Sequence, residues 1–187
     1  MDEATATGTS FPVTEGEIRL DLLVPADEEA FVAAVRASRA LHHPWIDLAD
    51  TPARFASTLA RFRAEDQHAF LARHRSCGGL VGYVSLSNIV RGGFQSAYLG
   101  YGAFVGHEGR GLMTSALRAA VRVAFFGLGL HRVEANIQPA NERSLALAWR
   151  VGFQREGYSP RYLMVDGDWR DHERWALRVE ELTGSER

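Results

Sequence analysis

One stretch of the sequence decides the fold: Phe104-Val105-Gly106-His107-Glu108-Gly109-Arg110-Gly111-Leu112-Met113. A strand-like run leads into three glycines, and apolar residues then recur at helical spacing from Leu112 onward. The first N–H groups of a helix lack intrahelical partners, the helix dipole favours an anion there, and glycine allows close backbone approach. The stretch therefore predicts a strand, a loop and a helix, with a loop suited to binding phosphate. The alternative is that the glycines only ease a tight strand-to-helix turn.

Two common phosphate-binding motifs do not fit this stretch. A Rossmann fingerprint needs Gly-x-Gly-x-x-Gly, whereas the glycines here are spaced as Gly106-x-x-Gly109-x-Gly111. A Walker A loop needs a lysine, and the sequence has none, because all 21 basic residues are arginine. The missing lysine also excludes a Schiff base with pyridoxal phosphate. A GC-rich coding bias explains the absence of lysine best.

The composition is that of one globular domain. The 187 residues are 46% hydrophobic and 24% charged, with a net charge of −2, which supports a packed core. This charge balance indicates no polycationic surface, so we expect no direct binding of nucleic acid or membrane. The single Cys77 cannot form an intrachain disulfide, the N-terminus lacks a signal-peptide pattern, and the longest apolar run, residues 123–130, is too short to span a bilayer. We therefore expect a cytoplasmic protein.

Turn signals and periodicity divide the first half of the chain. We expect residues 1–16 to form a flexible leader, 17–182 the domain and 183–187 a C-terminal tail. Within the domain, the pattern predicts a strand, two helices joined by a loop at His42-His43-Pro44-Trp45, and then an antiparallel meander of three strands. The strand lies at 18–22, the helices open at Pro25 and at the Thr51-Pro52 cap, and the meander occupies 68–73, 80–89 and 95–105.

The second half of the chain alternates between helices and strands. A long helix follows Gly111, and a second helix is capped by Asn141 and stopped by Gly152. Strands are predicted at 132–137, 153–165 and 169–179, the last two joined by the hairpin turn Asp166-Gly167-Asp168. The order β-α-α-β-β-β-α-β-α-β-β predicts a mixed α/β single domain.

A second segment makes the pattern specific. Asn136-Ile137-Gln138-Pro139-Ala140-Asn141-Glu142-Arg143-Ser144 is followed eight residues later by Gly152-Phe153. Together with the glycine loop, this segment resembles the GNAT superfamily of acyl-CoA N-acyltransferases. Several stretches also resemble its RimJ-type ribosomal-protein alanine N-acetyltransferases: Ser87-Asn88-Ile89-Val90-Arg91-Gly92, Tyr98-Leu99-Gly100-Tyr101, Gly109-Arg110-Gly111-Leu112-Met113 and Asp166-Gly167-Asp168-Trp169-Arg170-Asp171-His172. The likeness extends from about residue 18 to residue 180.

The resemblance implies a fold, a co-substrate and a reaction. The fold is a single GNAT-like domain with a central, mostly antiparallel twisted sheet of about six to seven strands and about four helices. The co-substrate is acetyl-CoA, no metal is needed, and a free amine attacks the thioester directly. The backbone amides of Gly109, Arg110, Gly111, Leu112 and Met113 would hold the coenzyme A pyrophosphate.

The resemblance also implies roles along the rest of the cofactor. Phe104 and Val105 would pair their backbone with the pantetheine arm, and one N–H there would polarise the thioester carbonyl. The Asn141 side chain would contact the same arm, and Ser144 would assist the departing thiolate. Gly106 departs from the family pattern, which commonly has Gln or Arg at this position, so one side-chain contact with coenzyme A is lost.

The residue that accepts the amine proton is left open by the sequence. Relatives that acetylate N-terminal amines can carry a Glu five residues before the helix-opening Asn, and here that position is Asn136, which cannot take a proton. Glu134 points to the same side of an ideal strand, and a water relay is a further alternative. Asp171-His172 could line the acceptor site, although a structural cross-strand pair is the plainer interpretation.

The acceptor is also left open, because one fold serves many acceptors. The leading hypothesis is acetylation of the N-terminal α-amine of a ribosomal protein. One alternative is acetylation of a small amine such as an antibiotic, a polyamine or an aminoacyl-nucleotide. Another is a non-catalytic acyl-CoA-binding regulatory module. The expected assembly is a monomer or a homodimer, and no His or Cys spacing typical of a metal site is present.

Overall fold

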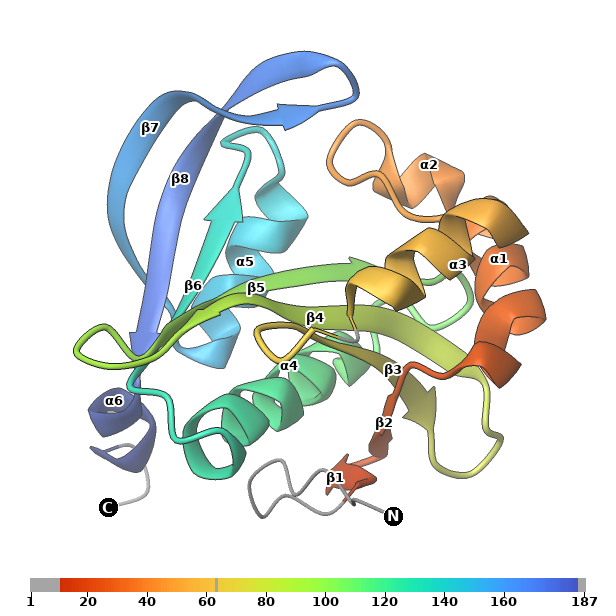
Figure 1. The fold of residues 1–187 in the computed structure, drawn as a ribbon, viewed down its shortest axis with the longest axis horizontal. Coiled ribbons are helices and arrows are strands. Elements are labelled where there is room, and N and C mark those ends of the chain that lie inside the picture. The colour runs from red at the N-terminus through yellow and green to blue at the C-terminus, as the bar shows by residue number, and fades with distance from the viewer. Residues whose placement is uncertain (1–10, 63, 185–187) are drawn as a thin grey trace.

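Eight strands form one continuous sheet in the computed structural model, which describes residues 11–62 and 64–184 (Figure 1). The order across the sheet is β1-β2-β3-β4-β5-β6-β8-β7. The strands are β1 (Val13–Glu15), β2 (Ile18–Leu22), β3 (His68–His74), β4 (Leu80–Val90), β5 (Ser96–Ala103), β6 (Arg132–Ile137), β7 (Gln154–Val165) and β8 (Asp168–Arg178). Each pair of neighbours is antiparallel except β5 and β6.

Helices cover both faces of this sheet. They are α1 (Glu28–Ala37), α2 (Arg39–His42), α3 (Pro52–Arg61), α4 (Leu112–Arg122), α5 (Glu142–Val151) and α6 (Val179–Gly184). The predicted caps are confirmed. The Thr51 side chain accepts a hydrogen bond from the Arg54 N–H, and Asn141 does the same for the Ser144 N–H. Gly152, with φ of +114°, ends α5 in the left-handed conformation that favours glycine.

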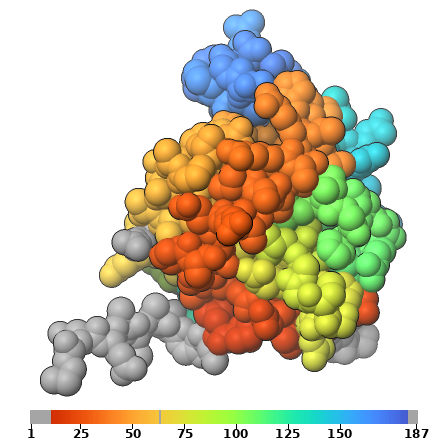
Figure 2. All heavy atoms as spheres, turned by 90° about the vertical axis from the view of Figure 1, so that its right-hand side faces the viewer, coloured from red at the N-terminus to blue at the C-terminus, as the bar shows by residue number. Residues whose placement is uncertain are grey.

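The core is divided in two by the sheet, because successive side chains of a strand point to opposite faces. On β3, Phe70 packs in the cluster beneath α4 and α5, whereas its neighbour Leu71 packs in the cluster beneath α1 and α3. The second cluster is aromatic: the Phe31 ring lies 5.4 Å from that of Phe55 and 5.9 Å from that of Phe104. Figure 2 shows the α1 to α3 side of the molecule, with the tip of β7 and β8 in blue above the orange helices.

The sheet opens between its two central strands. β5 and β6 are parallel and pair only from Ser96–Arg132 to Tyr98–Glu134. β5 then continues to Ala103 and β6 to Ile137 without pairing with each other. A parallel pair needs a long crossover, and here α4 supplies it. The two strands therefore separate at their carboxyl ends, and the opening lies beside the N-terminus of α4.

The predicted fold class is confirmed, and the element count is higher than predicted. β1 lies inside the segment 1–16 that was predicted as a leader, of which residues 1–10 are outside the described part. α2 occupies part of the predicted loop, and α6 follows the last strand. All three elements have six residues or fewer, which is too short for a hydrophobic period to reveal them. Within the described residues, no helix combines the length and the apolar character needed to cross a membrane.

Candidate active site

A cleft of about 1490 Å³ occupies the opening between β5 and β6. Its lining comes from both faces of the sheet. On one face it is lined by the glycine loop, the first turn of α4 and the start of α5. On the other face it is lined by α2, the loop after α2 and the tip of the β7–β8 hairpin. The cleft can therefore receive two molecules from opposite sides and bring them together where the strands separate.

The glycine loop before α4 has the conformation of an anion-binding loop. Gly106, Gly109 and Gly111 have φ values of +96°, +73° and +75°, and Gly111 is the N-cap of α4 without a side-chain cap. A Cβ atom built on any of these three glycines would meet no atom within 4 Å, so the space in front of the loop is open. The N–H groups of Leu112 and Met113 lie in the first turn, where a helix has no internal acceptors. The geometry fits the predicted phosphate cradle.

The loop already attracts a negative group of its own. The Gly106 N–H donates to Glu108 Oε2 at 2.8 Å. Hydrogen bonds from the backbone of Glu108 itself and of Gly106 hold the pKa of the Glu108 carboxyl below its usual value. Basic groups stand nearby: Arg110 Nη2 lies 3.4 Å from His74 Nε2, and the His74 and His107 rings stack at 6.0 Å. The positive charge of the Arg110 guanidinium suits a phosphate that would replace the Glu108 carboxylate on the loop.

The unpaired edge of β5 lies at Tyr101. Backbone groups alternate between the two sides of a strand. The Phe104 N–H donates to Val81 O at 2.8 Å on the β4 side, and Gln95 O accepts from the Arg132 N–H at 3.1 Å on the β6 side. Even-numbered residues of β5 therefore bond to β4, and the N–H and C=O of Tyr101 point toward β6 beyond the last paired residue, Tyr98.

This geometry differs from the sequence expectation for Phe104 and Val105. The Phe104 N–H is bonded within the sheet, and its side chain is buried in the aromatic cluster. The Val105 N–H donates to Ser38 Oγ at 3.0 Å. Both N–H groups thus already have protein partners, and the edge open to an extended ligand is at Tyr101. Sequence reasoning could not find this edge, because it depends on how far β6 accompanies β5.

The start of α5 lies against this edge. Asn141 Oδ1 accepts from the Ser144 N–H at 3.2 Å, and the Tyr101 hydroxyl donates to the Ser144 carbonyl at 3.2 Å. Burial raises the pKa of Tyr101 to about 12, so its hydroxyl stays protonated at neutral pH. Asn141 and Ser144 both line the cleft. Their places beside the pantetheine arm and the sulfur stay predictions.

On the other face of the sheet, the part of the cleft beneath α2 and the β7–β8 tip (the acceptor chamber) contains Asn136, His42 and His172 among its polar side chains. Asn136 Oδ1 is buried and has no hydrogen-bond partner within the part of the chain that the structure describes. His42 is buried, with Nε2 2.8 Å from Ala103 O, and His172 is buried, with Nδ1 2.9 Å from Arg170 O. All three line the cleft. His172 thus lines the cleft, while a role beside the acceptor stays a prediction, and His42 was given no role by the sequence.

Glu134, which the sequence offered as an alternative base, lies outside this chamber. Arg132 Nε donates to Glu134 Oε1 at 2.7 Å, and the same guanidinium also bonds Glu156. Glu134 is not among the residues that line the cleft. Of Asn136 and Glu134, only Asn136, which cannot take a proton, lines the opening.

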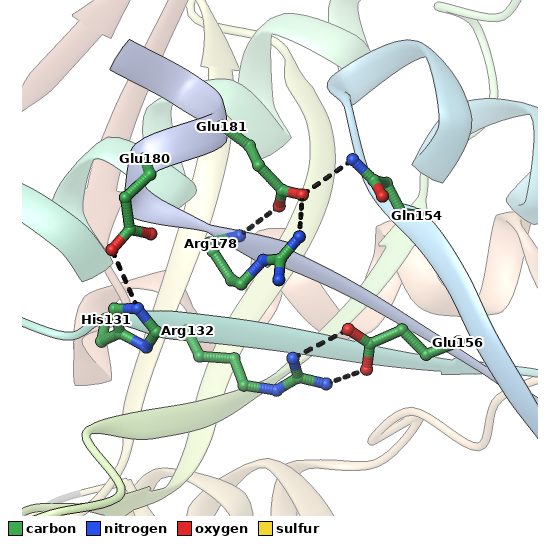
Figure 3. A network of polar contacts seen from close by, with 7 residues as sticks. All are labelled: His131, Arg132, Gln154, Glu156, Arg178, Glu180 and Glu181. Atoms are coloured by element: carbon green, nitrogen blue, oxygen red, sulfur yellow. Dashed lines mark hydrogen bonds and ion pairs between the residues drawn. The ribbon is translucent and has the colours of Figure 1, made fainter. Parts of the chain in front are cut away.

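A polar network surrounds the start of β6, where β6 is still paired with β5 (Figure 3). Arg132 on β6 pairs with Glu156 on β7, and the Glu181 carboxylate on α6 accepts from Gln154 and from Arg178. Two oxygens of Glu156 face the Arg132 guanidinium, which lowers the pKa of Glu156 and raises that of Arg132. The network fixes β6 to β7 and β8 on the side of β6 that faces away from β5. β6 is therefore held in place where it separates from β5.

The loop after α2 closes the far end of the opening. Gln138, just past β6, donates from Nε2 to Pro44 O and to Trp45 O, each at 3.3 Å. His42 holds the same segment to β5 through Ala103 O. The loop therefore bridges the two separated strands and forms a wall of the acceptor chamber.

Comparison with known proteins places these features in a family. Residues 17–154 match the family described as Acetyltransferase (GNAT) domain. The [Ribosomal protein uS5]-alanine N-acetyltransferase of Escherichia coli (strain K12) is 44% identical over 104 residues, which are 56% of this chain and 54% of that protein. The chain thus spans about half the length of the first curated relatives it matches.

Solved structures share the whole fold. Mycobacterium smegmatis RimJ, in complex with CoA-disulfide, superposes with a TM-score of 0.82 at 30% identity, over 91% of this chain and 87% of that one. Spermidine N-acetyltransferase from Vibrio cholerae, in complex with CoA and spermine, has a TM-score of 0.76 over 90% of this chain and 99% of that one. Its 17% identity shows a common fold alone. With its splayed β5 and β6, its glycine loop and its match over residues 17–154, the chain belongs to the GNAT acetyltransferase family.

Proposed function

We propose that this protein transfers the acetyl group of acetyl-CoA to a primary amine. The observation that carries the proposal is the open cleft, in which a phosphate-binding loop and an unpaired strand edge lie side by side. The loop suits the pyrophosphate of coenzyme A, and the edge at Tyr101 suits the two amide groups of its pantetheine arm. A RimJ structure that contains a coenzyme A derivative superposes on this chain, which supports the same co-substrate here.

The cleft residues suggest how the reaction proceeds. The pyrophosphate would accept hydrogen bonds from the N–H groups of Gly111, Leu112 and Met113, with Arg110 supplying positive charge. The arm would then run along β5, and the Tyr101 N–H would polarise the thioester carbonyl as negative charge develops on its oxygen. The Ser144 hydroxyl would donate to the departing thiolate. Attack by the amine is direct, so no protein nucleophile is needed.

We propose the N-terminal α-amine of a ribosomal protein as the acceptor. The names of relatives over half of the chain support this choice, since they act on the alanine of ribosomal protein uS5. Asp166 lines the acceptor side of the cleft and favours a group that arrives as a cation, whereas Asp47 beside it is paired with Arg54. A terminal α-amine has a pKa of about 7.7–8.0, so a sizeable fraction is neutral and ready to attack near pH 7.5.

Mass spectrometry of acetyl transfer tests the proposal. Peptides with free N-terminal Ala or Ser, and total ribosomal protein, are incubated with acetyl-CoA and the purified chain. The matched control is each peptide with a blocked N-terminus and an internal lysine. We expect one added acetyl group on the free N-terminus and none on the control.

Two other results would replace the proposal. If the peptides and ribosomal proteins stay unmodified while a polyamine, an antibiotic or an aminoacyl-nucleotide is acetylated, the chain is a small-amine acetyltransferase. If calorimetry shows acetyl-CoA binding but no amine releases coenzyme A thiol, the chain is a non-catalytic acyl-CoA-binding module.

A further inference from the structure

We infer that His42 is the base that takes the proton from the attacking amine. This inference rests on the proposed acetyl transfer and names a residue for the step that the sequence left open. It starts from a ring nitrogen of His42 that bonds to no other group within the described residues.

The bond to Ala103 determines which nitrogen of His42 is free. A carbonyl oxygen can only accept, so the 2.8 Å contact between His42 Nε2 and Ala103 O requires a hydrogen on Nε2. Nδ1 of the neutral ring is then unprotonated. Nδ1 bonds to no other group within the described residues, and it is not among their buried atoms without a hydrogen-bond partner, so it stays accessible. The His42 side chain lines both the main cleft and a second, smaller cavity. Burial lowers the pKa of His42, against an opposing effect of the Ala103 bond, and keeps the ring neutral at pH 7.

His42 also lies where the reaction would take place. A Cβ atom built on Gly102 would lie 3.4 Å from His42 Nε2 and 3.1 Å from Leu48 Cδ1, so the imidazole packs directly on Gly102. Gly102 follows Tyr101, whose edge would hold the thioester. The His42 and Phe104 rings, 6.1 Å apart, pack edge to face and fix the imidazole against β5. A rigid base beside the thioester edge is the arrangement that proton removal during attack requires.

A second cavity offers the proton a way out. It has a volume of about 390 Å³, and His42 lines both this cavity and the main cleft. The charged groups around it come from α1, α2, α3, the intervening loop and the β7–β8 turn: Arg36, Arg39, Asp47, Asp50, Arg54 and Asp166. Arg54 pairs with both Asp47 and Asp50, and His43 pairs with Asp166. The main cleft adds further titratable and charged groups to its lining: Tyr101, His107, Glu108, Glu142, Arg143, Arg150 and His172.

Asn136 on β6 also lines this part of the cleft. Its Oδ1, however, is sealed from the cleft and has no hydrogen-bond partner within the described residues. This oxygen therefore offers the amine no contact, and the unprotonated nitrogen of His42 carries the inference.

The step balances with acetyl-CoA as the only co-reactant. The amine nitrogen forms a C–N bond to the acetyl carbon while one of its protons moves to His42 Nδ1. The C–S bond breaks, and its electron pair leaves on sulfur. The thiolate takes up one proton and leaves as coenzyme A thiol, and His42 returns one proton to water, so the proton count is unchanged.

The pH dependence of His42→Gln tests the assignment. Glutamine can keep the donor to Ala103 O but cannot take a proton. In the wild type, two groups must lose a proton: the amine, with a pKa of about 7.7–8.0, and His42, whose pKa lies below its usual 6.5. We therefore expect log kcat/KM to rise with a slope of two at the acid end and of one nearer neutrality. His42→Gln should show a slope of one throughout, about 100-fold lower kcat/KM, and acetyl-CoA affinity within about twofold.

His172→Gln is the matched control, because it alters the other neutral imidazole of the chamber. It should keep the slope of two, and an NMR titration of the wild type should show the His42 ring as the Nε2–H tautomer with a pKa below 6.5. If His172→Gln loses the slope of two, or if active wild type and His42→Gln share rate and slope, the assignment to His42 is overturned while acetyl transfer stands. A wild type that acetylates no amine removes the proposed function and this inference together.

Discussion

Replacing Gly111 by aspartate tests the phosphate cradle most directly. Gly111 has φ of +75°, and an L-residue in this left-handed region costs about 1–2 kcal/mol of stability. Asparagine has the same shape as aspartate and visits the same region, so Gly111→Asn carries a similar backbone cost without the charge. A Cβ atom at this position meets no atom within 4 Å, so neither side chain collides with the protein. The two variants therefore differ by one negative charge in front of the loop.

The size of the charge effect follows from Coulomb's law. Two unit charges 4 Å apart repel by about 1 kcal/mol in water and by about 4 kcal/mol at an effective dielectric constant of 20. The loop is open to solvent in front, so the lower part of this range applies, and about 1.4 kcal/mol corresponds to a tenfold loss of affinity. We expect Gly111→Asp to bind acetyl-CoA at least about tenfold more weakly than Gly111→Asn.

Isothermal titration calorimetry with acetyl-CoA measures this difference, and circular dichroism confirms that both variants are folded. The loss should shrink in high salt, because the charges are exposed to the solvent and screened by ions. Equal affinity of the two variants would show that the pyrophosphate lies elsewhere, and the assignment of the loop would then be refuted.

Three further predictions concern residues around the cleft. Ser144→Ala should lower kcat about tenfold and leave the acetyl-CoA affinity measured by calorimetry unchanged, because the Ser144 hydroxyl would act only on the departing thiolate. A parallel loss of affinity would instead place Ser144 in cofactor binding. Tyr101→Phe removes the donor to the Ser144 carbonyl and should cost about 1 kcal/mol in chemical denaturation, and no change would mean that water replaces the hydroxyl. Glu156→Gln should make Tm fall less steeply on acidification. Arg132 lowers the pKa of Glu156 in the folded protein. The stabilisation from the ionised Glu156 is therefore complete above its unfolded pKa of about 4.3 and is lost as the pH falls through the lower folded pKa. An acid transition identical to that of the wild type would contradict this role of Glu156.

Sequence reasoning was most accurate where the signal is local. Thr51 and Asn141 were predicted as helix caps, and both side chains accept the expected backbone hydrogen bond. The hairpin at Asp166-Gly167-Asp168 joins β7 and β8 as predicted. In each case neighbouring residues suffice, because a cap or a turn is made by the residues that encode it.

Sequence reasoning failed where partners lie far apart in the chain. α2 has only four residues, too few for a helical period, so His42 was assigned to a loop and given no role. Its partner, Ala103, lies 61 residues later. Likewise, the pairing of Arg132 with Glu134 and Glu156 removes Glu134 from the cleft, and a sequence pattern that places Glu134 on the correct strand cannot show this.

The sequence by itself indicated the family, through the resemblance of its motifs, and predicted the glycine loop and the caps of α3 and α5, whereas acetyl-CoA as co-substrate stays a proposal. These rest on residues close together in the chain, whose φ values and helix-terminal N–H groups follow from local structure. The tertiary structure alone decided that the free edge of β5 is at Tyr101, that Asn136 Oδ1 lacks a partner and that His42 stands beside that edge. The physical reason is that backbone groups alternate along a strand, so the open edge depends on where β6 stops pairing with β5, which no local pattern records.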